Sequence, residues 1–176
     1  MASLFRQLLG NALERAPAPV RVLHETALPQ RFEGQAQMRA AGSLLARLAA
    51  RIAGLPRHEG RVSMAVTIER DGEGERWTRH FPPAPFVSRL WSRDGLLCER
   101  LGPSEIRFRL HADGAGIVWE PVALRVFGVL PMPALLLRGV RAREGVDAQG
   151  RYTFEVEASF PVLGSVAAYA GWLHVE

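Results

Sequence analysis

Residues 75–81, ERWTRHF, alternate between polar and aromatic side chains with a period of two, which is typical of a β-strand with one buried face. Trp77, Arg79 and Phe81 share one face, and the two aromatic residues indicate that this face is turned to the core. A guanidinium group is therefore predicted inside an apolar interior. Leaving such a charge unpaired costs several kcal/mol, so Arg79 requires a carboxylate partner or a water-filled cavity.

The same alternation recurs from residue 61 onward and predicts a series of short strands joined by hairpins. The alternating runs lie at 62–68, 106–110 and 152–160, and turn signals lie at Asp71-Gly72, Asp94-Gly95, Asp113-Gly114 and DAQG (147–150). Asp-Gly is favoured in tight hairpins because both central positions of the turn need positive φ. Hairpins pair neighbouring strands antiparallel, so we expect an antiparallel meander of about eight to ten strands. A sheet of that size curls into a barrel or half-barrel.

An amphipathic helix is predicted at the start of the chain. Apolar side chains recur at helical spacing in residues 2–14. Pro17 and Pro19 interrupt this pattern, and a short turn, VRVLHE (20–25), is expected to follow.

A second helix is predicted at residues 43–54. Ser43 can cap it, apolar residues follow at helical spacing, and GLP (54–56) stops it. Between the two helices, FEGQAQMRAAG (32–42) predicts a strand or an extended segment. The fold class is therefore α+β, mostly antiparallel β: a curved meander sheet packed on one or two N-terminal helices, and wrapped around the helix at 43–54.

The length and composition fit one globular domain. The chain has 176 residues, of which 48% are hydrophobic and 23% charged. We expect a single domain over residues 1–176, with the N-terminal helix and a Pro-rich connector in 1–19 and the β-rich part in 20–176. No apolar run reaches the roughly 20 residues that span a bilayer, and polar residues interrupt the apolar N-terminus, so neither a transmembrane segment nor a signal peptide is predicted. The expected location is the cytoplasm.

Several residue types that catalysis and metal binding require are missing or scattered. The 22 Lys and Arg residues are all arginine, which excludes a Schiff-base lysine and the lysine of a phosphate-binding loop. Cys98 is the single cysteine, so the chain has no internal disulfide. The five histidines lack metal-ligand spacing, and GAGIVW (114–119) predicts a hairpin rather than a dinucleotide site. No catalytic residue, metal or cofactor is therefore predicted.

A set of basic residues falls on the predicted outer face of neighbouring strands. They are Arg89, Arg93, Arg100, Arg107, Arg109 and His111, with Trp91 among them. Basic grooves with stacking aromatic residues occur in nucleic-acid-binding proteins, but solubility also demands a charged outer face. Because the net charge is only +4, we do not expect nucleic-acid binding.

The best carboxylate partner for Arg79 is Glu99. In GLLCERLG (95–102), Glu99 shares a strand face with two leucines, and Ser88 and Tyr169 are further polar groups on apolar strand faces. Two interpretations stay open: a buried Arg–Glu bridge that fixes strand register, or a polar patch at the base of an apolar small-molecule pocket. Acid–base catalysis by Glu99 is disfavoured because a carboxylate paired with arginine stays ionised.

The segment VFGVLPMPALLL (126–137) is almost entirely apolar, and Pro131 and Pro133 suit neither a helix nor a central strand. It is expected to plug one end of the barrel as a loop, or to form the lip of an apolar pocket or a contact surface for a partner or membrane. The N-terminal helix lacks a basic cluster, so docking on the domain is favoured over binding to lipid.

The order of motifs along the chain resembles a bacterial family catalogued as domain of unknown function 4166. The matching motifs are RVLHE (21–25), FEGQAQMRAAG (32–42), ERWTRHF (75–81), FVSRL (86–90), CERLGP (98–103), LPMP (130–133), GRYTFEV (150–156) and FPVLGSVAAYAGWL (160–173). The positions most like the family pattern are His24, Trp77, Arg79, Phe81, Ser88, Glu99, Tyr169, Gly171 and Trp172. The resemblance implies no established activity. Because members also occur fused to NAD-binding domains resembling saccharopine dehydrogenase, it implies an accessory role beside redox enzymes, with any cofactor supplied in trans.

The preferred hypothesis is a non-catalytic module that binds an apolar or amphipathic small molecule inside the curved sheet. Arg79 would anchor an acidic head group, Glu99 would hold Arg79 in place, and Trp77 and Phe81 would form part of the wall, with Ser88, Tyr169 and His24 completing the candidate ligand-binding set.

Two other hypotheses stay open. The chain can be an interaction domain that supports an NAD-dependent oxidoreductase or a lipid-modifying enzyme, with residues 126–137 as the contact surface. It can also be an enzyme that works through Glu99, His24 or Tyr169.

Overall fold

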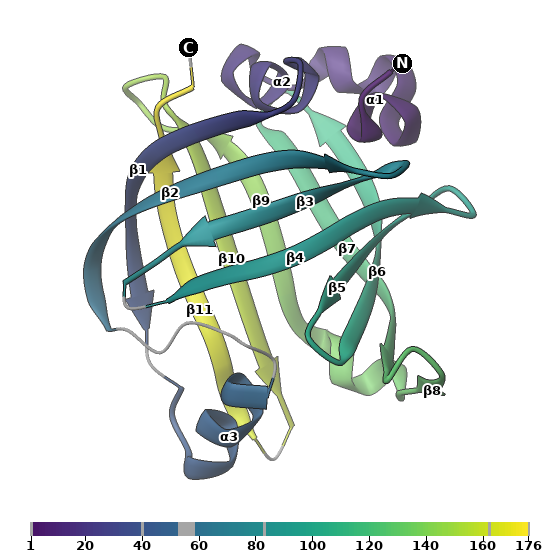
Figure 1. The fold of residues 1–176 in the computed structure, drawn as a ribbon, viewed down its shortest axis with the longest axis vertical. Helices are drawn as coiled ribbons and strands as arrows, with labels where there is room; N and C mark the ends of the chain where they lie inside the picture. The colour runs from purple at the N-terminus through teal and green to yellow at the C-terminus, as the bar shows by residue number, and fades with distance from the viewer. Residues whose placement is uncertain (1, 40, 53–58, 83, 162, 176) are drawn as a thin grey trace.

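The computed structural model describes residues 2–39, 41–52, 59–82, 84–161 and 163–175. Within these residues, ten antiparallel strands close into a barrel (Figure 1). The barrel strands are β1 (Gln30–Arg39), β2 (Gly60–Asp71), β3 (Gly74–His80), β4 (Pro85–Arg93), β5 (Leu96–Leu101), β6 (Ser104–Asp113), β7 (Gly116–Val126), β9 (Gly139–Val146), β10 (Tyr152–Phe160) and β11 (Gly164–Leu173). The short strand β8 (Leu130–Pro131) pairs with the end of β7 outside the barrel.

The sheet closes because its two outer barrel strands pair with each other. Neighbours follow the order β6-β5-β4-β3-β2-β1-β11-β10-β9-β7, and β7 then pairs with β6. Hairpins join many of these neighbours, but β1 pairs with β11, and β7 with β9, across longer stretches of sequence. The predicted antiparallel meander is confirmed, and of the two expected forms, barrel and half-barrel, the barrel is the one present.

The hairpin turns form where the Asp-Gly signals predict them. Asp94 and Gly95 both have positive φ, 54° and 73°, as a tight two-residue hairpin requires. The carboxylate of Asp113 accepts hydrogen bonds from two backbone N–H groups of its own turn, and Asp147 does the same before β10. These turns fix the register of the strands on either side of them.

Glycine allows the first and last strands to pair closely. At Gly34 in β1, a Cβ atom would lie 1.9 Å from the carbonyl oxygen of Trp172 in β11, and at Gly171 one would lie 2.1 Å from the carbonyl oxygen of Gln35. Any side chain at either position would therefore push β1 and β11 apart.

The N-terminal segment is helical and covers the upper end of the barrel in Figure 1. It comprises α1 (Leu4–Leu9), the 3-10 helix η1 (Gly10–Arg15) and α2 (Ala18–Glu25). The helix predicted at 2–14 is thus divided in two, and the prediction of a turn at 20–25 is wrong. Pro17 is the N-cap of α2 and Pro19 lies in its first turn, where proline fits because the first N–H groups of a helix have no partner within it.

These N-terminal helices fill the upper part of the barrel interior. Four of their apolar side chains are at most 2% exposed and join the core formed by the inner faces of the strands: Phe5, Leu13, Val20 and Leu23. Phe5 stacks on His24 with ring centroids 3.5 Å apart and lies 5.6 Å from the ring of Trp119. The helices therefore close one end of the barrel.

Helix α3 (Leu44–Ile52) lies at the opposite, lower end (Figure 1). The Ser43 hydroxyl caps it by accepting a hydrogen bond from the backbone N–H three residues on, as predicted, and the predicted stop at 54–56 lies outside the described residues. The expectation that the sheet wraps around this helix is wrong, because the leucines of α3 are exposed rather than turned to the core. Instead, Ala46 and Ala50 pack on Val166 of β11 at the rim.

The apolar segment 126–137 also lies at the lower end. It contains the end of β7, the strand β8 and most of the 3-10 helix η2 (Ala134–Arg138). Leu137 is buried, and Met132 and Leu136 pack against the core. Four other side chains of this segment are between 51% and 80% exposed: Phe127, Val129, Leu130 and Leu135. No helix of the described residues is long and apolar enough to cross a membrane.

Shortening Phe5 tests the role of the N-terminal helices. Phe5→Ala is expected to lower the free energy of unfolding by about 3–5 kcal/mol, because it leaves a void between His24 and Trp119. Equilibrium unfolding in urea measures the change. The control is Gln7→Ala on the exposed side of α1, which should change stability by less than about 0.5 kcal/mol. Equal unfolding midpoints for the two variants would show that the helices do not stabilise the barrel.

Candidate functional site

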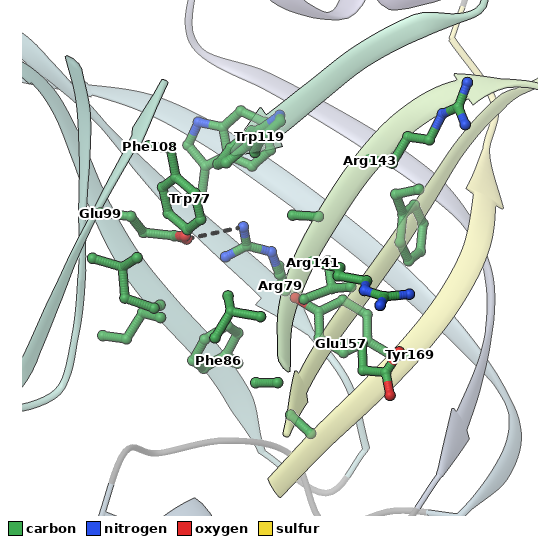
Figure 2. Close-up of a pocket in the computed structure, with 18 of the residues that line it drawn as sticks. Trp77, Arg79, Phe86, Glu99, Phe108, Trp119, Arg141, Arg143, Glu157 and Tyr169 are labelled. Carbon is green, nitrogen blue, oxygen red and sulfur yellow. Dashed lines mark hydrogen bonds and ion pairs between the residues drawn. The ribbon is translucent and has the colours of Figure 1, made fainter. Parts of the chain in front are cut away.

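A cavity of about 210 Å³ lies inside the barrel, below the N-terminal helices (Figure 2). Strands on all sides of the barrel and α3 contribute to its walls. Most lining side chains are apolar, and the aromatic ones are Trp77, Phe86, Phe108, Trp119, Tyr152, Phe154, Phe160 and Tyr169. The charged lining side chains of the described residues are Arg79, Glu99, Arg141, Arg143, Glu144 and Glu157 (Figure 2). Apolar walls with a smaller number of polar groups are the composition typical of a small-molecule site.

Arg79 lies on the inner face of β3 and lines the cavity with only 8% of its surface exposed. Its Nη2 group lies 3.3 Å from Oε1 of Glu99 (Figure 2). Its Nη1 group donates to the Ser88 hydroxyl at 2.8 Å. The guanidinium carbon lies 5.4 Å from the centre of the Trp77 ring and 5.3 Å from that of Phe86. The predicted pair is present, and two aromatic rings hold the cation in place.

The electrostatic surroundings keep Arg79 charged. Burial lowers the pKa of its guanidinium, but the neighbouring Tyr169 and Glu99 outweigh that effect, so the pKa is raised overall. Burial raises the pKa of the Tyr169 phenol, although nearby Arg79 opposes the rise. The pKa of Tyr152 is raised well above its usual value, first by burial and then by Glu144. The two phenols are therefore neutral hydrogen-bonding groups in the cavity wall.

A second polar pair lies beside the cavity. Nε2 of His24 in α2 lies 2.5 Å from Oε2 of Glu144 in β9, and both side chains are almost completely buried. His24 also stacks on Phe5 and lies 5.8 Å from the ring of Trp77, while its Nδ1 atom has no hydrogen-bond partner among the described residues. Glu144 lines the cavity, so His24 supports this carboxylate from behind.

The structure brings together most of the residues predicted for the site. Trp77, Arg79, Glu99 and Tyr169 line the cavity. Ser88, Phe81 and His24 stand one layer behind the lining: Ser88 holds Arg79, Phe81 packs edge-on against Tyr169 with centroids 5.7 Å apart, and His24 holds Glu144. Whether any of them binds a ligand stays a prediction.

Sequence reasoning missed Glu144 and Tyr152 as parts of this site. Glu144 shares its strand face with Val140 and Ala142, which is the same signal that identified Arg79. Arg141 and Arg143 alternate with these residues along β9. Two arginines beside a glutamate are the pattern expected of a strand exposed to solvent. Tyr152 reads as an ordinary member of the apolar face of β10, and its hydroxyl is recognised as part of the site only when its neighbours are known.

The described residues offer few means of catalysis. Among the described residues, three carboxylates line the cavity: Glu99 and Glu144, which already have partners, and Glu157 of β10 (Figure 2). Cys98 is fully buried, and burial raises the pKa of its thiol, so it is a poor nucleophile. No cluster of three or more His, Cys, Asp or Glu side chains in the described part of the chain could hold a metal ion.

The basic outer face of the barrel is largely neutralised by neighbouring groups. Arg109 and His111 both pair with Glu120, and hydrogen bonding from His111 lowers the pKa of that carboxylate. Arg89 pairs with Asp71. These pairs agree with the sequence interpretation of a solvated outer face.

Titration of the two tyrosines tests the burial of the polar groups in the cavity. The folded pKa values of Tyr152 and Tyr169 are raised, so the folded state keeps phenolic protons that the unfolded chain loses near pH 10. Stability should therefore be complete below about pH 10 and fall as the pH rises above it. The chain has only these two tyrosines, so phenolate absorbance reports on them alone. Phenolate should appear only with unfolding, whereas the chain in guanidinium should titrate normally. A normal titration in the folded state would contradict the description.

Comparison with known proteins places the chain in a family but assigns no activity. Residues 17–173 match the model of a family described as "Domain of unknown function (DUF4166)". No curated protein matches the sequence. The matched region contains α2 and every strand of the barrel, together with Arg79, Glu99, Glu144 and both tyrosines, whereas α1 and η1 precede it. Because the match extends over most of its length, the chain belongs to the family of domain of unknown function DUF4166.

Proposed function

We propose that the barrel binds an apolar or amphipathic small molecule, without transforming it, in the cavity beside Arg79. The main support for this proposal is the buried, charged guanidinium of Arg79 in the wall of a largely apolar cavity inside a closed barrel. The apolar part of the ligand contacts the aromatic and aliphatic walls, and its acidic head group contacts Arg79.

The cavity is large enough for such a ligand. An apolar cavity of about 150 Å³ can hold benzene. The cavity of this barrel is larger, at about 210 Å³. Each methylene group buried in it would contribute about 0.8 kcal/mol to binding. An acyl chain or a small ring system would therefore bind through contact with the walls alone.

Arg79 would fix the orientation of the ligand in the cavity. A guanidinium has five N–H donors, and the hydrogen bonds to Ser88 and Glu99 use two of them, which leaves donors for a ligand atom. Hydrogen bonds between charged groups contribute about 1.5–3 kcal/mol. The Tyr169 phenol, kept neutral by burial, lies close enough to influence the pKa of Arg79 and can share in the contact.

Glu99 provides a test that depends on the charge of the ligand. It holds Arg79 in position, but its carboxylate also competes with an acidic ligand for the same guanidinium. Replacing Glu99 by glutamine keeps the shape of the side chain and removes that competing charge. An acidic ligand should then bind more tightly, whereas a neutral one should not.

Calorimetric titration with decanoate, and with decanol as its uncharged counterpart, tests the proposal. Arg79→Gln should weaken decanoate binding about 10- to 100-fold, because it removes a charge-assisted hydrogen bond, and should change decanol binding little. Glu99→Gln should strengthen decanoate binding. The matched control is Arg109→Gln on the outer face, which should bind decanoate as the parent protein does.

Folding of the variants must be checked separately, because Arg79→Gln leaves Glu99 unpaired in the interior. The double variant Arg79→Gln/Glu99→Gln removes both charges and serves as the folded reference, and it should also bind decanoate weakly. Failure of the parent protein to bind either probe would refute a ligand site for fatty-acid-like molecules. Unchanged decanoate affinity in the double variant would remove Arg79 as the anchor.

A further inference from the structure

The most exposed large apolar side chains gather at the lower end of the barrel. Among the described residues, every large apolar side chain that is more than half exposed lies either on α3 or in the segment 126–137. We call these side chains the apolar rim: Leu44, Leu45, Leu48, Ile52, Phe127, Val129, Leu130 and Leu135. Figure 1 shows α3 and β8 at this end, on different sides of it and opposite the N-terminal helices. Exposed apolar side chains in such numbers point to an interaction site.

The contribution of α3 follows from how the helix packs. Ala46 and Ala50 are at most 1% exposed and rest on β11, so the small residues of the helix face the barrel. At 3.6 residues per turn, the four rim residues of α3 fall within an arc of roughly 100° on another side of the helix. Arg47 and Arg51 lie directly beside this arc, and both are exposed. A helix with an apolar arc bordered by arginines has the pattern of helices that lie in a membrane interface.

The charge of the rim has one sign. The sequence has no Asp or Glu between residues 34 and 58, or between residues 121 and 143. Arg47, Arg51 and Arg138 are exposed and have no carboxylate partner among the described residues, in contrast to the paired arginines of the outer face. The two segments that form the rim therefore present exposed cations beside apolar side chains, which complements a surface of anionic headgroups over hydrocarbon.

We propose that the apolar rim docks on the surface of an anionic lipid bilayer. The leucines of α3 and the exposed residues of 126–137 insert at the level of the acyl chains, and the three arginines contact headgroup phosphates. A protein partner would have to match two apolar groups on separate elements with one shaped surface, whereas a fluid bilayer accommodates both.

The rim adjoins the cavity, which links docking to ligand exchange. Ala49 of α3 lines the cavity, and so do Leu101, Ser104 and Phe160 at the ends of their strands. The lower end of the barrel in Figure 1 would therefore be the place where a molecule passes between the bilayer and the cavity. This route rests on the function proposed above, but docking itself does not.

Co-sedimentation of the ligand-free protein with vesicles tests the docking. Phosphatidylcholine vesicles that contain phosphatidylglycerol should bind the protein more tightly than phosphatidylcholine alone, and added salt should weaken the binding. Leu44→Asp/Leu48→Asp and Phe127→Asp/Val129→Asp should each weaken it at least about tenfold. Arg47→Glu/Arg51→Glu should abolish the preference for phosphatidylglycerol. The matched control is Val87→Asp, an exposed apolar residue on the outer face of β4, which should bind as the parent protein does.

The rim residues are exposed, so these variants should keep the unfolding midpoint of the parent, which thermal unfolding verifies. Absence of vesicle binding, or equal binding by the rim variants and Val87→Asp, would overturn the proposal. So would a dimer or a complex with another protein that forms without lipid and is lost in the rim variants. Decanoate binding without vesicle binding would reject docking and keep the ligand site, and the reverse outcome would reject the ligand site alone.

Discussion

A barrel of ten strands encloses more space than its own inward side chains can fill, because barrel diameter grows with strand number. The remaining features of this protein follow from that constraint. At one end the chain supplies the missing volume from its N-terminal helices, whose Phe5 and Leu13 are completely buried. Below these helices, the described residues do not fill the interior of the barrel, and the remaining space is the cavity. The glycines that let β1 and β11 pair complete the closed wall without which neither the buried helices nor the cavity would be enclosed.

Within that cavity, the buried charged groups come in compensated sets rather than as isolated charges. Arg79 is satisfied by Glu99, Ser88 and two aromatic rings, and Glu144 is satisfied by His24. Each set joins distant parts of the chain: Arg79 and Glu99 link β3 to β5, and His24 and Glu144 link α2 to β9. These contacts therefore tie the N-terminal helix and several strands to one register. A stabilising role and a binding role are compatible for these residues, since a held guanidinium is also a pre-organised one.

The sequence contains the local features of this fold but not the long-range ones. Alternation along β3 and the Asp-Gly turns are properties of neighbouring residues, so the strands, the hairpins and the inward direction of Arg79 could be predicted. Closure depends on pairing of β1 with β11 and β7 with β9, which no local pattern encodes. Helix α3 was misplaced because its leucines read as a buried face, whereas its alanines are buried and the leucines are exposed. Glu144 was missed because Arg141 and Arg143, which precede it, resemble the arginines of a strand exposed to solvent. Helix α2 was missed because the prolines at its start were interpreted as the end of the preceding helix.

The N-terminal helices have one more consequence for whatever the barrel holds. With the upper end closed by Phe5 and its neighbours, the barrel does not form an open channel from end to end. A molecule bound as proposed above would therefore have to reach and leave the cavity from a side other than that of the N-terminal helices, with its acidic group at Arg79 and its apolar part against the walls.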